Sequence, residues 1–383
     1  MEKFFKLKEH GTDARTEVTA GITTFLAMVY ILAVNPSILS ATGMDSSAVF
    51  TATAISAAFA TLIMAFYANY PVALASGMGL NVYFAFSVCS PMARDGIQDP
   101  WKIALAAVLC EGIIFILLSF TNFREKLVND IPENLKYGIT AGIGLFIAIV
   151  GLKGAGIVIA DPSTLVTLGK LGSPQFVLAF IGLIVIAILN HYKVKGDILI
   201  GILVTWILGI IAQQTGWYHV DPTNGINSLL PSFKGGFFPA KMNIFSFDFD
   251  WIGKHIIDFA IIVFSFLFVD IFDTVGTLIG VASKGNLLDE NGDLPRAKQA
   301  LLADALGTVA GACIGTSTVT SYVESSAGVA AGGRTGLTSL VTAVLFILSL
   351  FLSPIFLAIP GFATTPALLW VGLLMVSAIK NMK

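Results

Sequence analysis

The sequence predicts an all-α polytopic membrane protein, and three observations support this fold class. Its 383 residues are 56% hydrophobic and only 12% charged, whereas soluble domains carry about 25% charged residues. Mean hydropathy is +0.84. Apolar stretches of span length recur along the whole chain, and a weak similarity relates its first part to its last part. A soluble protein with a single hydrophobic core is therefore excluded.

The apolar stretches define the expected spans, because a helix needs roughly 20 mainly apolar residues to cross the hydrocarbon core. The first stretch follows a polar leader and has no clear small-residue cleavage site, so we expect a membrane span and not a signal peptide. The twelve expected spans lie near residues 18–39, 48–69, 72–89, 101–121, 133–153, 174–190, 196–213, 253–282, 298–314, 316–333, 336–353 and 363–380.

The distribution of basic residues predicts the orientation. Alternating the spans from a cytoplasmic N-terminus places most of the 22 Lys and Arg residues on the cytoplasmic side, as the positive-inside rule requires. We therefore expect a multi-pass protein of the cytoplasmic (cell) membrane, surrounded by the lipid bilayer, with its N-terminus in the cytoplasm. The net charge of -2 gives no reason to expect a nucleic acid partner.

A weak internal repeat relates two halves of the chain. The spans near 72–89 and 316–333, each third in its half, are interrupted by glycine or polar residues, and matching breaks indicate an inverted repeat and its binding site. Seven spans precede the polar connection at 213–250 but five follow it, so we expect two terminal spans to be missing. The alternative is a complete twelve-span protein. Four residues of the first half have an identical counterpart at the same spacing in the second half: Ile131 corresponds to Ile359, Pro132 to Pro360, Gly144 to Gly372 and Leu145 to Leu373.

Acidic residues inside the apolar spans are the first candidates for function. An ionised carboxylate at mid-bilayer costs at least about 2.5 to 3.5 kcal/mol on insertion scales, so each should face a cavity, pair with a donor or hold a proton. We expect three of them, Glu111, Asp258 and Asp304, to be structural partners. The full set is Glu111, Asp258, Asp270, Asp273, Asp304 and Glu324.

Glu324 lies where the tenth span is expected to break. Its segment is GTSTVTSYVESSAG, in which β-branched and hydroxyl residues favour extended backbone and the small residues that follow suit a short helix. The start of a half-helix presents free backbone N–H groups to a ligand. The carboxylate could accept two parallel hydrogen bonds from a flat solute that bears N–H groups. The alternative is a Glu324 bonded only to Ser325, Ser326 or a neighbouring span.

Asp270, Asp273 and Thr277 are spaced i, i+3 and i+7 in FVDIFDTVGTLIG, which places them on one stripe of the eighth span. Two close carboxylates disfavour joint ionisation and burial disfavours it further, so we expect at least one to hold a proton. A proton carrier needs such a group. The alternative is that Asp270 only supports the broken spans by bonding to their backbone.

Asn81 is the candidate on the third span, in SGMGLNVYFAF. Its amide offers donors and an acceptor beside Gly77 and Gly79, which allow close backbone approach. The alternative is a capping role for Asn81 and helix packing for the glycines. The three cysteines show no ligand spacing, so we expect no metal site and no cofactor except a coupling proton.

Four segments resemble the nucleobase transporter superfamily, and most closely its branch of purine permeases for adenine, guanine and hypoxanthine. They are TAGITTFLAMVYILAVNPSIL, ASGMGLNVYFAF, FVDIFDTVGTLIGVA and TSTVTSYVESSAGVAAGGRTGL. The resemblance implies two inverted repeats of seven spans, with short strands in broken spans three and ten. It also implies a core domain at 1–121 and 251–353, a gate domain at 122–250 and 354–383, and a possible homodimer through the gate.

The resemblance further implies a purine site between the half-helices of spans three and ten. Carried onto this chain, the contacts are Asn81, Asp273, Thr277 and Glu324, with Ser325 beside the last, while Asp270, Asp273 and Glu324 are the candidates for proton coupling. Relatives that move uracil or xanthine have a His or Asp where Thr277 stands, which implies a different substrate preference here.

We therefore expect proton-coupled uptake of purine nucleobases by movement of the core against the gate, and no enzymatic activity. Uracil or xanthine transport on the same fold is one alternative. An anion transporter or channel of that fold is another, although two acids facing the solute argue against it. A membrane-embedded enzyme using Asp270 and Asp273 as an acid pair lacks a nucleophile motif or metal-ligand cluster in the sequence.

Overall fold

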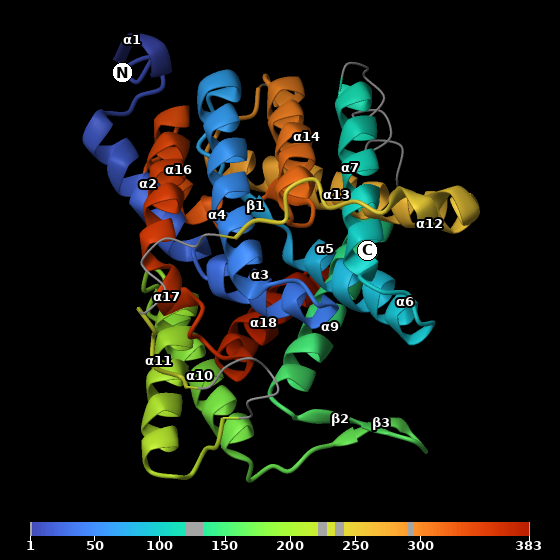
Figure 1. The fold of residues 1–383 in the computed structure, drawn as a ribbon. Coiled ribbons are helices and arrows are strands. Elements are labelled where there is room, and N and C mark those ends of the chain that lie inside the picture. The colour runs from blue at the N-terminus through green and yellow to red at the C-terminus, as the bar shows by residue number, and fades with distance from the viewer. Residues whose placement is uncertain (1, 120–132, 221–227, 234–240, 290–293, 383) are drawn as a thin grey trace. The chain divides into compact units, whose positions relative to one another are not determined.

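The computed structural model describes residues 2–119, 133–220, 228–233, 241–289 and 294–382. Helices dominate these residues (Figure 1), which confirms the predicted all-α class. The contacts divide the chain into two compact units. Unit 1 comprises residues 1–132 and 239–350, and unit 2 comprises residues 133–238 and 351–383.

Unit 1 contains the first part of the chain and most of its last third. Its strands are β1 (Leu74–Ser76) and β4 (Val319–Ser321), and its short helical turns are η1 (Ser40–Thr42), η2 (Met64–Ala68) and η3 (Tyr83–Cys89). Its helices are α1 (Glu2–Phe5), α2 (Ala14–Met28), α3 (Ile31–Leu39), α4 (Ser46–Ile63), α5 (Met78–Val82), α6 (Ser90–Arg94), α7 (Pro100–Ser119), α12 (Phe249–Lys254), α13 (Ile256–Lys284), α14 (Ala297–Ile314), α15 (Ser325–Ala330) and α16 (Gly336–Ser349).

Unit 2 is smaller and carries a two-stranded hairpin. The turn η5 (Leu350–Leu352) lies at the junction of the two units in sequence. The elements of unit 2 are α9 (Glu133–Gly154), β2 (Val158–Asp161), β3 (Leu165–Leu168), α10 (Pro174–His191), α11 (Asp197–Gln214), α17 (Ser353–Phe356), α18 (Gly361–Val376) and η6 (Ser377–Asn381).

The expected spans coincide with helical segments. Seven of them are continuous segments that are long and apolar enough to cross a membrane, counted over the described ranges only. The other five expected spans coincide with the broken third span, α13, α14, the broken tenth span and the shorter α18. Within unit 1, α16, α4, α14 and α7 stand in a row (Figure 1), each packed against the next.

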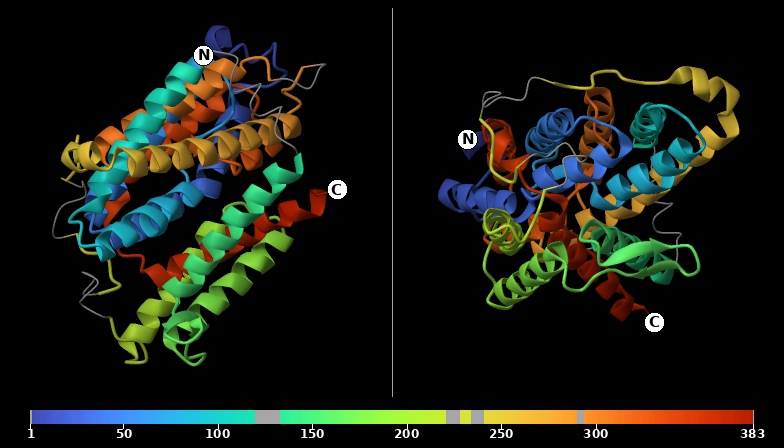
Figure 2. Two further views of the ribbon diagram at one scale, coloured as in Figure 1. Left: turned by 90° about the vertical axis from the view of Figure 1, so that its right-hand side faces the viewer. Right: turned by 60° about the horizontal axis from the view of Figure 1, so that its bottom comes forward.

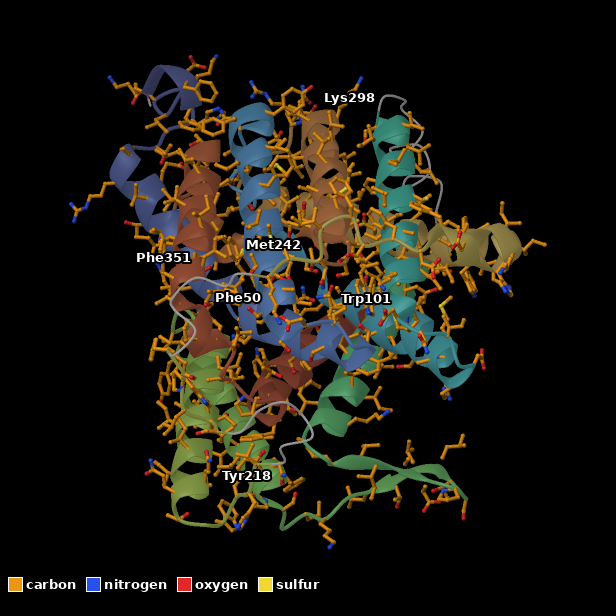
Figure 3. The ribbon with its side chains drawn as sticks, in the orientation of Figure 1. Phe50, Trp101, Tyr218, Met242, Lys298 and Phe351 are labelled. Carbon is orange, nitrogen blue, oxygen red and sulfur yellow. The ribbon has the colours of Figure 1, made fainter. Side chains whose placement is uncertain are left out.

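The N-terminal ends of several helices are formed by residues that accept from free backbone N–H groups. Asp45 accepts from the N–H of Ala48 at 3.0 Å at the start of α4. Lys298 extends from the start of α14 (Figure 3), at the end of unit 1 near which α1 lies. That this end of unit 1 faces the cytoplasm stays a prediction.

The two broken spans meet in a small sheet inside unit 1. β1 and β4 pair antiparallel, with Ala75 opposite Thr320. This confirms the expected strands in spans three and ten. A two-stranded sheet inside a membrane leaves two open edges whose N–H and C=O groups need partners.

Two threonines close these edges. The Thr61 hydroxyl of α4 donates to the C=O of Leu74 at 3.1 Å and accepts from its N–H at 2.9 Å. The Thr308 hydroxyl of α14 does the same for Val319, at 2.9 and 3.2 Å. Because each hydroxyl satisfies both groups of one edge residue, extended backbone is tolerated at this depth.

Gly144 and Gly372, which correspond in the internal repeat, both lie in unit 2. α9 and α18 lie along each other (Figure 2), and a Cβ on Gly144 would lie 2.7 Å from the C=O of Gly372. A Cβ on Gly372 would likewise lie 2.7 Å from the C=O of Gly144. The two helices therefore approach at backbone distance, as small residues permit. The repeat pairs at residues 131 and 132 lie outside the described residues.

The sequence places the domain boundaries at 121, 250 and 353. Residue 121 lies outside the described ranges, and the contacts divide the chain after residues 132, 238 and 350. The assignment of core and gate roles to these units stays a prediction.

Candidate functional site

Glu324 directly precedes α15, at the break of the tenth span, and is partly exposed. The hydroxyl of Tyr30 donates a hydrogen bond to Oε1 of Glu324 at 2.5 Å. Tyr30 lies between α2 and α3 and is fully buried. The carboxylate therefore sits at the predicted break, with one oxygen held by the first span.

Asn81 lies on α5 and is fully buried. Its Oδ1 accepts from the hydroxyl of Ser76 at 2.9 Å and from the hydroxyl of Ser317. Among the residues that the structure describes, Nδ2 of Asn81 has no hydrogen-bond partner. A buried donor without a partner costs about 1 to 3 kcal/mol. The amide is thus oriented by two hydroxyls, and its Nδ2 donor is left without an acceptor among the described residues.

An uncharged network joins Asn81 to the first span. Asn35 of α3 donates from Nδ2 to the hydroxyls of Thr53, at 2.7 Å, and Thr316, at 2.9 Å. The Ser76 hydroxyl in turn lies 3.2 Å from that of Thr316 and 2.8 Å from that of Ser317. The end of β1 and the residues just before β4 are therefore linked to side chains of α3 and α4.

Asp273 is partly exposed on α13. It lies close enough to both Glu324 and Asp270 for the carboxylates to repel each other. Thr277, one turn further along α13, is also partly exposed. The structure thus brings Asp273 and Glu324 together from two helices, as expected for a shared site. Their role as binding residues stays a prediction.

Asp270 has different surroundings from Asp273, although both lie on α13. It is fully buried, and the Thr274 hydroxyl lies 3.2 Å from its Oδ1 and 2.8 Å from Oδ1 of Asp304. The same hydroxyl lies 2.7 Å from that of Thr320 on β4. Asp270 therefore reaches the broken span through threonine hydroxyls, a linkage that the sequence analysis did not anticipate.

Glu111 and Asp304, expected as structural partners, belong to this buried group. Glu111 accepts from the Thr318 hydroxyl at 2.9 Å, and it is close enough to Asp270 and Asp304 for electrostatic repulsion. Three buried acids thus lie around β4. Asp258 differs, because its exposed side chain lies 3.6 Å from His255.

Ser325 is fully buried, and its hydroxyl oxygen accepts from the N–H of Ala73 at 3.0 Å. This hydrogen bond of Ser325 is therefore with the backbone that leads into β1. Tyr322 makes a related bond, because its hydroxyl donates to the C=O of Ser76 at 2.5 Å. Both contacts hold the two strands together, and a contact of Ser325 with solute stays a prediction.

Three polar residues in or next to the first span were not among the predicted site residues: Glu17, Tyr30 and Asn35. Glu17 is fully buried and accepts from the backbone N–H of Arg334 at 2.8 Å and from the Thr338 hydroxyl at 2.6 Å. The available signal was the presence of polar side chains in or next to an otherwise apolar stretch. Glu17 was excluded because the expected span began at residue 18.

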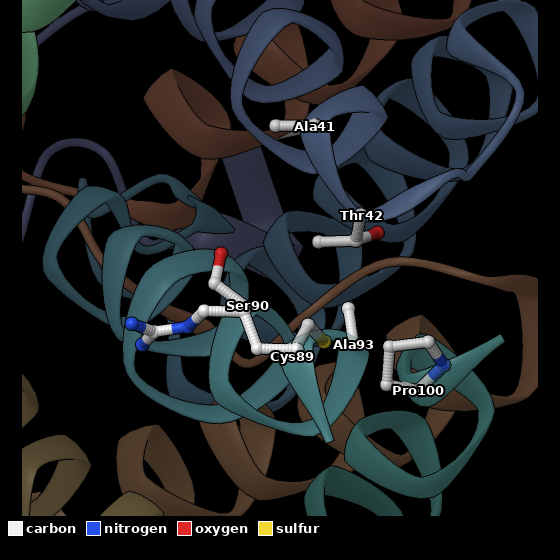
Figure 4. Close-up of a pocket in the computed structure, with 7 residues that line it drawn as sticks. Ala41, Thr42, Cys89, Ser90, Ala93 and Pro100 are labelled. Atoms are coloured by element: carbon white, nitrogen blue, oxygen red, sulfur yellow. The ribbon is translucent and has the colours of Figure 1, made fainter. Parts of the chain in front are cut away.

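A cavity of about 270 Å³ lies elsewhere in unit 1. None of the predicted site residues lines it (Figure 4). Its lining residues are Ala41, Thr42, Cys89, Ser90, Ala93, Arg94 and Pro100. The described ranges contain no group of three or more His, Cys, Asp or Glu placed to hold a metal ion.

Sequence comparison identifies related proteins. A model of the permease family matches residues 15–383. The chain is 49% identical over 380 residues to the guanine/hypoxanthine permease PbuO of Bacillus subtilis, covering 99% of this chain and 84% of that protein. It is 46% identical over 379 residues to the adenine permease AdeP of Escherichia coli, covering 99% and 81%. A putative permease of Methanocaldococcus jannaschii is 48% identical over 380 residues, with 99% and 83% covered.

Solved structures with similar folds are transporters of low sequence identity. The transmembrane domain of the cyanobacterial bicarbonate transporter BicA has a TM-score of 0.69 at 17% identity and covers 94% of this chain and 88% of that chain. SLC26A9 has a TM-score of 0.63 at 13% identity, covering 96% and 58%. At these identities the likeness describes the fold alone.

Proposed function

Because the chain belongs to the permease family, and is therefore a transporter and not an enzyme, we propose that it carries purine nucleobases into the cell together with protons. The coarser part of this proposal, nucleobase transport, is supported by relatives named for adenine and for guanine and hypoxanthine. The membrane is proposed to be the cytoplasmic membrane, with the N-terminus inside.

The observation that carries the purine assignment is that the two broken spans supply one carboxylate and one unsatisfied amide. Glu324 supplies acceptor oxygens, and Nδ2 of Asn81 supplies a donor without a partner in the described chain. Purines such as guanine and hypoxanthine carry N–H donors close to a ring nitrogen or oxygen acceptor. A flat solute of this kind satisfies both groups, whereas a simple anion would be repelled by Glu324 and Asp273.

The repulsion between Asp273 and Glu324 supports the proposal of proton coupling. A charge inside the membrane is costly, and a proton on either acid removes one of two like charges. The base then completes the remaining hydrogen bonds. In the proposed mechanism unit 1 acts as the core and unit 2 as the gate. The core moves against the gate either with a bound base or empty. Thr277 and Ser325 are proposed to contact the purine, and Asp270 is proposed to carry a proton. A homodimer formed through the gate stays a prediction.

The proposal is tested by equilibrium binding of radiolabelled adenine, guanine, hypoxanthine and uracil to the purified full-length chain between pH 5 and 8. We expect at least one purine to bind, with an affinity that changes with pH, and uracil to bind weakly. Glu324→Gln should abolish this binding, whereas Glu9→Gln, an exposed acid in unit 1, should leave it unchanged. Failure of every purine to bind refutes the proposal.

Proton coupling is tested separately, by uptake into cells. A protonophore should reduce purine accumulation, and Asp273→Asn should reduce its dependence on external pH. If the protonophore does not change purine uptake, proton coupling is refuted but purine transport is not.

A further inference from the structure

The first span supplies a partner for Glu324 that the proposed function does not use. The Tyr30 hydroxyl lies 2.5 Å from Oε1 of Glu324. A hydroxyl that donates to an ionised carboxylate is typically about 2.5 to 2.7 Å from it. The Tyr30 ring is fully buried, so its hydroxyl has little freedom to leave this position. The contact has the geometry of a charge-assisted hydrogen bond.

The backbone that carries Tyr30 is tightly packed against the helix that Glu324 begins. α2 packs on α15, and a Cβ on Gly328 would lie 2.7 Å from the C=O of Ala20 and would overlap the hydroxyl of Thr24. Such backbone contact fixes the position of one helix on the other. The Tyr30 hydroxyl is therefore held relative to Glu324 by packing as well as by its own hydrogen bond.

A second clamp joins the other end of α2 to the start of α16. The buried carboxylate of Glu17 accepts from the N–H groups of Arg334, at 2.8 Å, and Thr338, at 3.1 Å. The segment from Glu324 to Thr338 is thus attached to the first span at both ends. Neither clamp depends on a bound solute.

We propose that Tyr30 is a positioning residue of the purine site, an inference that rests on the proposed function. A proton on Oε1 would require the Tyr30 hydroxyl to turn and accept instead of donate, because a hydroxyl can do either. The bond that it donates therefore favours the ionised carboxylate and influences the pH at which the coupling proton binds. Tyr30 also fixes the plane in which Glu324 presents its oxygens to the purine N–H. Among the described residues, Asp273 and the Tyr322 hydroxyl are further ionisable groups that act on Glu324.

The test compares Tyr30→Phe with Tyr70→Phe in the purified full-length chain. Tyr70 is also buried in unit 1, but its hydroxyl accepts from the N–H of Arg296 at 3.1 Å. The ligand is whichever of adenine, guanine and hypoxanthine the wild type binds best, between pH 5 and 8. Loss of a hydrogen bond to a charged group should weaken binding about ten- to hundredfold and displace the pH profile along the pH axis.

Tyr70→Phe should leave affinity and pH profile unchanged, even if it lowers the melting temperature. Tyr30→Phe with wild-type affinity and a superimposable pH profile overturns the inference while purine binding by the wild type stands. Absence of purine binding by the wild type removes the proposed function and this inference with it. If Tyr30→Phe does not fold, 3-fluorotyrosine at position 30 retains the ring and hydroxyl and acidifies the phenol. An unchanged pH profile then overturns the inference.

Discussion

Replacing Thr308 with valine tests whether single hydroxyls hold the extended backbone inside the membrane. Valine has nearly the same shape as threonine but can neither donate nor accept. In the wild type the Thr308 hydroxyl donates to the C=O of Val319 at 2.9 Å and accepts from its N–H at 3.2 Å. Thr308→Val therefore leaves both groups of a fully buried strand residue without this partner.

The expected cost follows from the two groups that lose their bonds. Each buried group left unsatisfied costs about 1 to 3 kcal/mol, so we expect a loss of about 2 to 5 kcal/mol from the variant. Thr61→Val should behave in the same way, because the Thr61 hydroxyl makes the equivalent pair of bonds to Leu74. The strands carry Ser76 and lead into Asn81 and Glu324, so purine binding should weaken as well.

The control is Thr51→Val on α4. Thr51 is also buried, but its hydroxyl donates only to the C=O of Ser47 one turn earlier, at 2.9 Å, a carbonyl that the helix already uses. The assay is the melting temperature of the purified chain in detergent, with purine affinity measured in parallel. We expect clear losses for Thr61→Val and Thr308→Val and little change for Thr51→Val. Equal behaviour of all three variants would refute the edge-closing role.

Three further predictions concern other parts of the chain. Glu17→Gln should lower the melting temperature, because each charge-assisted bond from Glu17 to the start of α16 contributes about 1.5 to 3 kcal/mol. Glu9→Gln, at an exposed position, should leave the melting temperature unchanged. Equal melting temperatures for the two variants would show that Glu17 does not stabilise the start of α16. Gly144→Ala should destabilise unit 2 by about 1 to 3 kcal/mol through overpacking, because its Cβ meets a carbonyl at 2.7 Å. Gly142→Ala, with nothing within 4 Å, should be neutral or stabilising, and a similar loss in both would argue against the close approach. The pKa of Asp161 is held below its usual value by hydrogen bonds from the backbone N–H groups at the hairpin turn, so its contribution is present at neutral pH. That contribution is lost only as the pH falls below about 3.9. Asp161→Asn should accelerate amide exchange in the turn at pH 7, and unchanged exchange would count against this bond.

The predicted spans agree with the structure because the bilayer imposes a simple length and polarity requirement on every helix. The break at Glu324 was also visible, since Thr316, Thr318, Val319 and Thr320 favour extended backbone. Matching breaks in the two halves marked spans three and ten, whereas the pairing of β1 with β4 was not predicted. In each case the information is local in sequence or is repeated at a fixed separation.

The partners of the buried acids were not predictable in the same way. Helical spacing correctly placed Asp270 and Asp273 on one helix, yet it could not show that Asp270 joins Asp304 through Thr274 while Asp273 approaches Glu324. A helical stripe is wide enough for neighbouring residues to face different helices. Which helix each acid faces depends on the packing of the whole unit.

The sequence by itself determined the membrane class, the positions of the apolar segments and the two polar breaks, because hydropathy and backbone preference are properties of short segments. The tertiary structure alone decided which distant residues meet there. Tyr30 contacts Glu324 and Glu17 contacts Thr338 across about 300 positions of the chain. Such contacts arise from close packing of small residues between helices, so no local spacing records them.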